Sequence, residues 1–370
     1  MDVQKILVMN GGGDAPGLNA VIRAAVKRAI LGYDWEVVGS IEAFNGVLDD
    51  PMRIMKLDLH SVVGLLMRGG TILGTSNQGG PFEFPARRPD GEIEVVDRSD
   101  ELIRRLHRIG VDAVVSIGGD GSQRIAQGLF EKGLPVVGVP KTIDNDLGAT
   151  EMTFGFQTAV ETATDAIDKL HTTAESHDRV IIVEVMGRDA GWIALSAGLA
   201  GGADTILIPE IPFEVDHIAL HVKRRRKAGH HFAIIVVAEG AFPLGGTALT
   251  VKQREPGHPN PILGGVGRWL GDELEVRGFK HTRCCVLGHI QRGGIPVPMD
   301  RLLATRYGVA VVDLIAEGKF GHMVALRGDD IVSVPIRDAI SHYRNVNLDH
   351  NLVRTARGLG VCLGDRVPAS

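Results

Sequence analysis

The sequence predicts an α/β protein of two similar, doubly wound lobes, with mostly parallel sheets and an active site between the lobes. Two observations support this fold class. Short apolar runs rich in β-branched residues recur along the 370 residues, and amphipathic segments lie between several of them. Continuous apolar runs bounded by Gly or Pro are typical of strands buried on both faces. Their alternation with helices indicates parallel sheets.

Eight such runs are expected to form strands. They cover residues 6–9, 37–41, 113–118, 136–140, 180–186, 205–209, 232–240 and 284–288. Most of them end in polar or glycine-rich residues, and ligands of open α/β sheets bind beyond the carboxyl ends of the strands. Seven loops therefore form the candidate site: NGGGDAPG, GGDGS, KTIDND, GRDAG, EIPF, EGA and GHIQRGG.

Amphipathic helices are expected at residues 17–33, 99–110 and 156–174. The first has an apolar face and is expected to stop near Gly32. Ser99 is expected to cap the second helix and Gly110 to end it.

The composition gives no sign of nucleic-acid or membrane partners. The net charge is −5, and no apolar segment approaches the roughly 20 residues of a membrane span. The first apolar run is too short for a signal peptide. Adjacent Cys284 and Cys285, with Cys362, do not suggest a disulfide framework, so a reducing cytoplasm is expected.

Two glycine-rich loops suggest phosphate binding. The first, NGGGDAPGLN (10–19), lies between a strand and a helix, where backbone N–H groups attract anions. It is neither a Walker A loop, because Leu18 stands where the lysine would be, nor a dinucleotide fingerprint, because Pro16 replaces the last glycine. A simple tight turn remains the alternative.

The second loop, GGDGS (118–122), adds a carboxylate. Asp120 is placed to face Mg²⁺, and Ser122 to open the next helix. Magnesium–phosphate sites typically use one or two carboxylates, with phosphate oxygens supplying other ligands. A Gly-Asp turn capped by Ser122 is the alternative.

The stretch PKTIDND (140–146) holds two acids. Asp144 and Asp146 occupy alternate positions, so on an extended segment they would point the same way. One would act as a general base while the other adjusts its pKa or reaches the metal. The alternative is local turn chemistry, with Asn145 and Asp146 bonding their own backbone.

Five basic residues flank two predicted strands of the second half. They are Arg179, Arg188, Arg283, His289 and Arg292. Because arginine binds phosphate oxygens through two parallel hydrogen bonds, the group suggests a sugar-phosphate pocket.

Together GGGDAPGLN, GGDGS, PKTIDND, EVMGR (184–188) and LGHIQRGG (287–294) resemble the 6-phosphofructokinase family in order and spacing. The resemblance runs from about residue 4 to 345, with insertions near 77–97 and 241–280. It implies residues 1–155 plus 291–341 as a phosphoryl-donor lobe and 156–290 plus 342–370 as a sugar-phosphate lobe. It also implies a homotetramer or homodimer with shared active sites.

The resemblance implies roles for individual residues. The nucleotide phosphates would lie on Gly13, Gly119, Asp120, Gly121 and Ser122, with Asp120 holding Mg²⁺. Asp144 would take the proton from the 1-hydroxyl of fructose 6-phosphate, with Thr142, Lys141 and Asp146 beside it. The sugar phosphate would be held by Met186, Gly187, Arg188, Glu239, His289 and Arg292, and by Arg179 and Arg283 of an adjacent subunit.

Two positions bear on the phosphoryl donor. In the family, Asp at position 121 and Lys at position 141 accompany pyrophosphate, and Gly at both accompanies ATP. This chain combines Gly121 with Lys141. A carboxylate at 121 would repel the α-phosphate, whereas Gly121 leaves room for it. Lys141 assists either donor and compensates for Asn77, where regulated relatives carry arginine.

The predicted function is therefore ATP-dependent phosphorylation of fructose 6-phosphate, with the pyrophosphate-dependent reaction as the alternative. A non-catalytic sugar-phosphate-binding homologue is a more distant alternative, against which Asp120, Asp144 and Arg188 count. An NAD kinase would share GGDGS and leave TIDND and HIQR unexplained.

Overall fold

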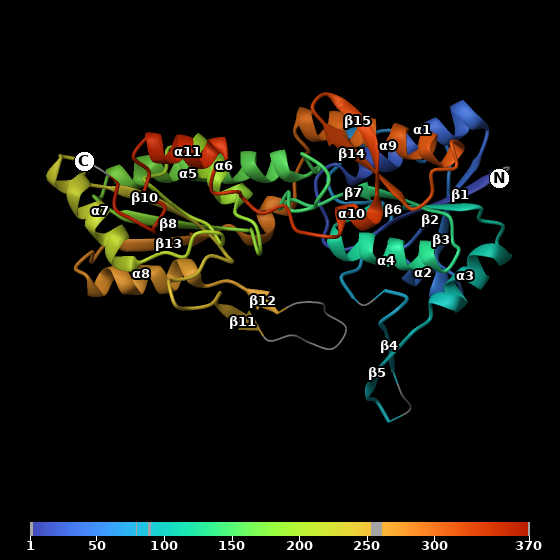
Figure 1. Ribbon diagram of the computed structural model, residues 1–370, viewed down its shortest axis with the longest axis horizontal. Helices are drawn as coiled ribbons and strands as arrows, with labels where there is room; N and C mark the ends of the chain where they lie inside the picture. The colour runs from blue at the N-terminus through green and yellow to red at the C-terminus, as the bar shows by residue number, and fades with distance from the viewer. Residues whose placement is uncertain (1–2, 79, 88–89, 253–260, 369–370) are drawn as a thin grey trace.

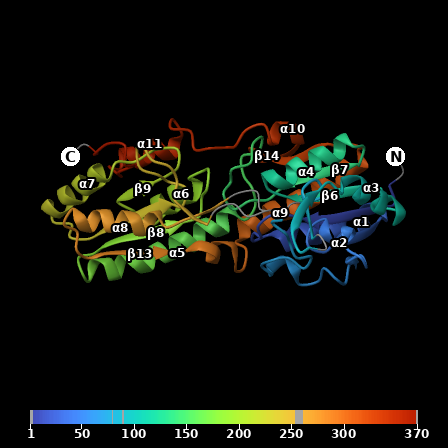
Figure 2. The same cartoon turned by 90° about the horizontal axis from the view of Figure 1, so that it is seen from below.

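A computed structural model describes residues 3–78, 80–87, 90–252 and 261–368, and it confirms the predicted fold class. Two lobes lie end to end along the long axis of the molecule (Figures 1 and 2), and the chain begins and ends at opposite ends of this axis. No helix within the described ranges is both long and apolar enough to cross a membrane.

The first lobe contains a seven-stranded sheet. Its spatial order is β15 (Asp330–Pro335), β14 (His322–Arg327), β7 (Val136–Pro140), β6 (Ala113–Gly118), β1 (Lys5–Asn10), β2 (Glu36–Ser40) and β3 (Ile54–Leu57). The five central strands are parallel, and the two edge strands run antiparallel to their neighbours. β14 and β15 come from far along the chain, so this lobe is discontinuous in sequence.

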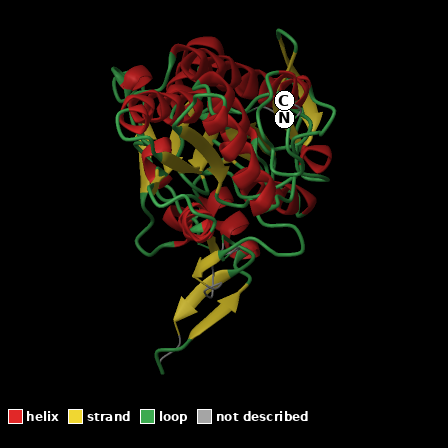
Figure 3. Ribbon diagram, turned by 90° about the vertical axis from the view of Figure 1, so that its left-hand side faces the viewer, coloured by secondary structure: helices red, strands yellow, loops and turns green. Residues whose placement is uncertain are grey.

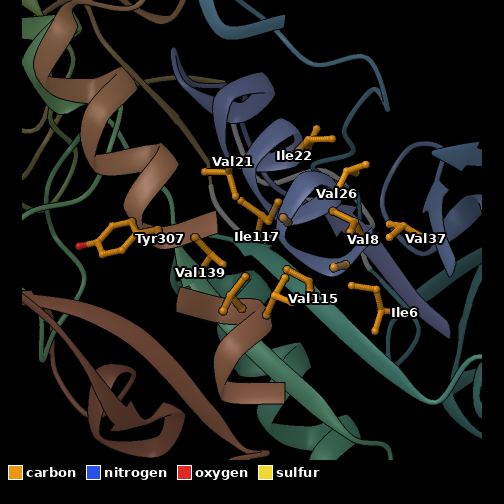
Figure 4. Close-up of a cluster of buried hydrophobic side chains, with 14 of the residues drawn as sticks. Ile6, Val8, Val21, Ile22, Val26, Val37, Val115, Ile117, Val139 and Tyr307 are labelled. Atoms are coloured by element: carbon orange, nitrogen blue, oxygen red, sulfur yellow. The ribbon is translucent and has the colours of Figure 1, made fainter. Parts of the chain in front are cut away.

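Helices cover both faces of this sheet. One face is covered by α1 (Leu18–Tyr33) and α9 (Pro298–Ala316), and the other by α2 (Asn45–Leu48), α3 (Ser99–Arg108) and α4 (Asp120–Glu131). Alternate strand residues serve the two cores: Ile6 and Val8 pack toward α1 and α9, whereas Leu7 packs toward the other helices (Figure 4). The central strands β1, β6 and β7 are buried on both faces, which explains their continuous apolar sequences.

The second lobe contains a smaller, four-stranded parallel sheet. Its order is β13 (Thr282–Val286), β8 (Val180–Val185), β10 (Ala233–Ala238) and β9 (Thr205–Leu207). One face is covered by α5 (Phe156–Glu175), α6 (Trp192–Ala200) and α11 (Asn351–Gly358), and the other by α7 (Val215–Lys227) and α8 (Val266–Val276). Short elements complete the fold: α10 (Ile336–Ala339), η1 (Leu65–Met67) and η2 (Gly288–Arg292).

Two antiparallel ribbons occupy the expected insertions. They are β4 (Phe84–Arg87) with β5 (Ile93–Val96), and β11 (Thr250–Lys252) with β12 (Ile262–Leu263). The β4–β5 ribbon extends away from the helices (Figures 1 and 3).

All eight predicted strands and the three predicted helices are present, but two helix ends differ from expectation. The first helix continues past Gly32, and Asp34 ends it in a left-handed conformation (φ 56°). Ser99 is the first helical residue and does not cap the second helix. Instead its N–H and hydroxyl both donate to the Asp97 carboxylate, at 2.8 and 2.5 Å. Asp34 therefore ends the first helix in place of Gly32, and Asp97 accepts the N–H at the start of the second helix in place of Ser99.

Candidate active site

The polar loops of both lobes follow the carboxyl ends of parallel strands, as expected. They meet where η2, which follows β13 of the second lobe, reaches the loop after β1 of the first. There Arg292 donates from Nη1 to the Asp14 carbonyl at 3.1 Å. A Cβ atom on Gly13 would lie only 2.7 Å from this Nη1 atom, so the close approach depends on glycine. The candidate site therefore lies between the lobes.

The glycine-rich loop packs tightly on the start of α4. A Cβ on Gly11 or Gly118 would lie 2.8 or 2.3 Å from the hydroxyl oxygen of Ser122, so neither position accepts a side chain without movement. Ser122 is the third residue of α4, and Gly119 is the N-cap, where no side chain satisfies the first N–H groups. An open helix N-terminus beside a glycine-rich loop is suited to bind phosphate.

Asp120, the first residue of α4, is the candidate metal ligand. Its carboxylate accepts hydrogen bonds from Arg124 (Nε, 2.8 Å) and the Tyr343 hydroxyl (3.3 Å), and its side chain remains 17% exposed. Within the described ranges, no group of three or more His, Cys, Asp or Glu residues could enclose a metal ion. A partly exposed carboxylate at a helix N-terminus is the kind of ligand that Mg²⁺ uses when phosphate oxygens and water supply its other ligands.

Lys141 is buried beside the glycine-rich loop, where its ammonium group donates to the Gly13 carbonyl. Burial lowers the pKa of Lys141 to about 7, and the positive charge of Arg292 contributes in the same direction. Added negative charge on a bound phosphate would stabilise the protonated amine. The side chain is thus placed to respond to phosphate in the cleft.

Asp144 and Asp146 lie close enough to influence one another. Burial raises the pKa of Asp144 to about 6 and that of Asp146 to about 7, and the charge of Asp144 adds to the shift of Asp146. The segment is bent and not extended as expected, because Asn145 has a positive φ of 53°. The Asn145 side chain accepts from the Thr153 N–H at 3.0 Å and so fixes the bend from outside the loop.

One oxygen of Asp144 is available for a substrate hydroxyl. Oδ1 is buried and has no hydrogen-bond partner within the described part of the protein. The Asp144 backbone N–H donates to the Thr142 hydroxyl at 3.1 Å, which orients the residue. A buried, unpartnered carboxylate with a raised pKa has the properties of a general base.

The second lobe contributes charged groups to the same cleft. Burial raises the pKa of Glu239 to about 7, and the positive charge of Arg188 opposes the shift. Both Arg188 and Glu239 also influence Asp144 electrostatically. The predicted sugar-phosphate residues at the carboxyl ends of β8, β10 and β13 are Met186, Gly187, Arg188, Glu239, His289 and Arg292.

Two predicted site residues are not in this cleft. Arg179 immediately precedes β8, and Arg283 is the exposed second residue of β13. Both therefore lie at the amino ends of strands whose carboxyl ends face the site. A strand of five or six residues spans roughly 17–20 Å, which separates these arginines from the cleft of their own chain.

Sequence reasoning missed three residues at the site. Asp189 influences the pKa values of Asp144 and Asp146, although it was read only as part of the loop GRDAG. Tyr343 reaches Asp120, and Arg344 bonds the acid-bearing loop. Tyr343 and Arg344 come from a segment about 200 residues further along the chain, so no local sequence pattern predicts their place in the site. Asp189 follows a predicted strand directly, and this position could have identified it as a site residue.

An open helix N-terminus beside a glycine-rich loop, the partly exposed carboxylate of Asp120 and the partly buried acid pair lie between two α/β lobes, an arrangement typical of a small-molecule phosphotransferase. A family model described as phosphofructokinase matches residues 5–315, and the chain belongs to the phosphofructokinase family.

Relatives with both phosphoryl donors are similar to this chain. ATP-dependent 6-phosphofructokinase of Chloroflexus aurantiacus is 52% identical, covering 98% of this chain and 99% of the relative. ATP-dependent 6-phosphofructokinase 1 of Synechocystis is 48% identical over the same shares. Pyrophosphate–fructose 6-phosphate 1-phosphotransferase of Amycolatopsis methanolica is 49% identical, covering 92% of this chain and 96% of the relative.

Solved structures share the fold. Phosphofructokinase from Saccharomyces cerevisiae matches 97% of this chain with a TM-score of 0.76 and 30% identity, and this chain spans 46% of the yeast chain. Pyrophosphate-dependent phosphofructokinase from Nitrosospira multiformis has a TM-score of 0.78 over 99% of this chain. At 18% identity the latter likeness concerns the fold alone.

Proposed function

We propose that this protein transfers the terminal phosphoryl group of ATP to the 1-hydroxyl of fructose 6-phosphate, giving fructose 1,6-bisphosphate and ADP with Mg²⁺. The observation that carries the donor assignment is the open space at Gly121. A Cβ there would meet no atom within 4 Å, so the α-phosphate of a nucleotide has room beside the start of α4. The names of the ATP-dependent relatives support the same donor.

The residues of the cleft divide the reaction between them. Asp144 takes the proton from the 1-hydroxyl, and the oxygen of that hydroxyl attacks the terminal phosphorus. Mg²⁺ on Asp120 and the protonated amine of Lys141 would neutralise the negative charge of the phosphates. The protein acts by positioning and charge neutralisation and forms no covalent intermediate.

The two lobes have separate tasks in this proposal. Residues 1–155 and 291–341 bind the donor, which agrees with β14, β15 and α9 completing the first sheet and its cover. Residues 156–290 and 342–370 bind the sugar phosphate. Arg179 and Arg283 reach the 6-phosphate of a neighbouring subunit, because their own cleft lies at the opposite ends of β8 and β13.

Pyrophosphate is the second candidate donor, and Lys141 is the observation that favours it. The buried amine serves a phosphate without requiring a nucleotide. The test is a direct comparison: purified protein, fructose 6-phosphate and Mg²⁺ are supplied with ATP or with pyrophosphate in separate assays. A higher kcat/KM with ATP supports the proposal, and a higher kcat/KM with pyrophosphate overturns the donor assignment.

A further inference from the structure

The chain crosses from the first lobe to the second between α10 and α11, and we call residues 341–350 the crossing segment. This segment passes directly beside the bent loop 142–146 that carries Asp144 and Asp146. Residues 147 and 343 form an antiparallel bridge there. The crossing segment is therefore in a position to hold the acid loop from the second lobe.

Arg344 makes the main contacts with the acid loop. Its backbone N–H donates to the Asp146 carbonyl at 2.7 Å, and its Nη1 atom donates to the Asn145 carbonyl at 3.2 Å. These two bonds fix the two peptide groups that flank Asp146, directly after the left-handed residue Asn145. The orientation of both acids depends on that bend.

The same residue is anchored to the second lobe. The Arg344 carbonyl accepts from Trp192 Nε1 at 2.7 Å, and its guanidinium lies over the Trp192 ring, 4.3 Å from the centroid. Trp192 begins α6, four residues after Arg188. One side chain thus joins the loop of the general base to the element that follows the sugar-phosphate arginine.

A second tie reinforces this anchor. Glu210 accepts from the Val346 N–H at 2.7 Å and from the Gly191 N–H at 3.0 Å. The crossing segment and the start of α6 are therefore fastened to one carboxylate. Because both ties are short and at least partly buried, a shift of α6 would be transmitted to the acid loop.

We propose that Arg344 is a positioning residue for phosphoryl transfer, which holds the acid loop at a fixed distance from the sugar-phosphate loop of the second lobe. It touches no reacting atom and acts through the backbone of Asn145 and Asp146. The proposal rests on the proposed function only where turnover is measured.

The principal test compares Arg344→Ala, Arg344→Lys and a control, Arg337→Ala. Arg337 lies in α10, its side chain is 77% exposed, and it forms an ion pair with the neighbouring Asp338. Arg344→Ala is expected to lower kcat about 100-fold, the effect of a misplacement on the order of 1 Å, with KM for ATP changed less than threefold. Lysine keeps the charge and one donor but cannot stack on Trp192 as a planar group, so Arg344→Lys should fall between the two.

The pH profile separates positioning from general stability. Asp144 faces charged groups from several elements: Arg188, Asp189, Glu239, Arg292, Lys141 and Asp146. Arg344→Ala keeps the backbone bond to Asp146 but loses the guanidinium bond to Asn145 and the stacking on Trp192. The acid loop should then relax and Asp144 should gain water, so the acidic limb of kcat/KM should move to lower pH. A purely structural role would lower the active fraction and leave this limb in place.

Amide hydrogen exchange gives a readout that does not need activity. In Arg344→Ala, residues 142–147 should exchange at least tenfold faster than in the parent, whereas Arg337→Ala should match the parent. Trp192→Phe removes the Nε1 donor and reduces the ring on which Arg344 stacks, but keeps the Arg344 side chain. It should give a smaller increase and keeps the test available if Arg344→Ala does not fold.

The proposal is overturned if exchange in residues 142–147 is unchanged in the folded variants, or if Arg344→Ala retains kcat within twofold of the parent. A parent protein that phosphorylates no sugar with either donor would instead refute the proposed function. Faster exchange in the same variants would then still support the role of Arg344 as a clamp.

Discussion

Lys141 donates a hydrogen bond from its buried ammonium group to the backbone carbonyl of Gly13, which joins the acid loop to the glycine-rich loop. The contact holds the positive charge of Lys141 against the glycine-rich loop, which is predicted to bind phosphate. Replacing Lys141 therefore tests whether this charge serves the transferring group.

Lys141→Gly is expected to lower kcat with ATP about 100-fold, the loss typical of removing one preorganised donor to developing charge. The comparison variant is Lys319→Gly, which removes an exposed lysine that forms a surface ion pair with Glu317. Steady-state kinetics at saturating substrates measure the effect. Equal kcat in both variants would show that Lys141 has no part in the transfer.

Asp144→Asn should reduce kcat by about 10²–10⁴-fold, because the amide cannot accept the proton of the 1-hydroxyl. The KM for fructose 6-phosphate should change much less. Asp146→Asn is the matched variant, since it removes the neighbouring carboxylate of the same loop. A near-normal kcat in Asp144→Asn would contradict this assignment and would indicate that Asp146 is the general base.

Burial of Asp144 also has a cost in stability that depends on pH. Its folded pKa is raised to about 6, above the roughly 3.9 of an unfolded chain, so the folded state binds an extra proton between these values. Stability falls as pH rises through this window and stays lower above it. Asp144→Asn should therefore raise the melting temperature more at pH 8 than at pH 5. Calorimetry at both pH values measures the difference, and an equal gain at both would contradict the raised pKa.

Gly121→Asp should abolish the use of ATP and spare pyrophosphate, because the new carboxylate would repel an α-phosphate that pyrophosphate lacks. The fold should tolerate the change, since a Cβ at position 121 meets no atom within 4 Å. Gly121→Ala adds the same Cβ without charge and should retain ATP. The measurement is kcat/KM for both donors in all three proteins. Efficient use of ATP by Gly121→Asp would refute the interpretation that Gly121 makes room for the α-phosphate.

Arg283→Ala should raise the KM for fructose 6-phosphate more than the KM for ATP, and mixing it with Asp144→Asn should restore part of the activity. Arg283 lies at the amino end of β13, away from the cleft of its own chain, so hybrid oligomers would contain some intact sites. Arg268→Ala, an exposed change in the neighbouring α8, serves as the control. No recovery after dissociation and remixing would mean that each site is built within one chain.

The buried parallel strands were predictable because their environment is uniform: Ile6, Val8, Val180 and Ile182 all face apolar cores, and the sequence runs are correspondingly apolar. The edge hairpin β14–β15 was not predicted. Arg327 and Asp330 pair across its turn at an exposed edge, so the two segments are too mixed in polarity to stand out.

The site could be predicted as far as its residues belong to loops directly after strands, as Asp120 and Asp144 do. The bend at Asn145 and the hydrogen bonds that Arg344 makes to the acid loop could not be predicted. The position of Asn145 in a left-handed conformation depends on Thr153, and the contacts of Arg344 depend on a return of the chain from the far lobe. Such tertiary contacts leave no periodic signal in the sequence.

The discontinuous first lobe has a consequence for protein synthesis. The strands β1, β2, β6 and β7 emerge from the ribosome long before α9, whose residues Leu303 and Tyr307 cover the same core. Until about 170 further residues have been translated, the part of this apolar face that α1 does not cover is exposed to water or to a chaperone. The strands and helices α5 to α8 of the second lobe are translated within that interval, but α11, which covers one face of the same sheet, follows even later. Each lobe is therefore completed only by segments that follow residue 297: α9, β14 and β15 for the first lobe and α11 for the second.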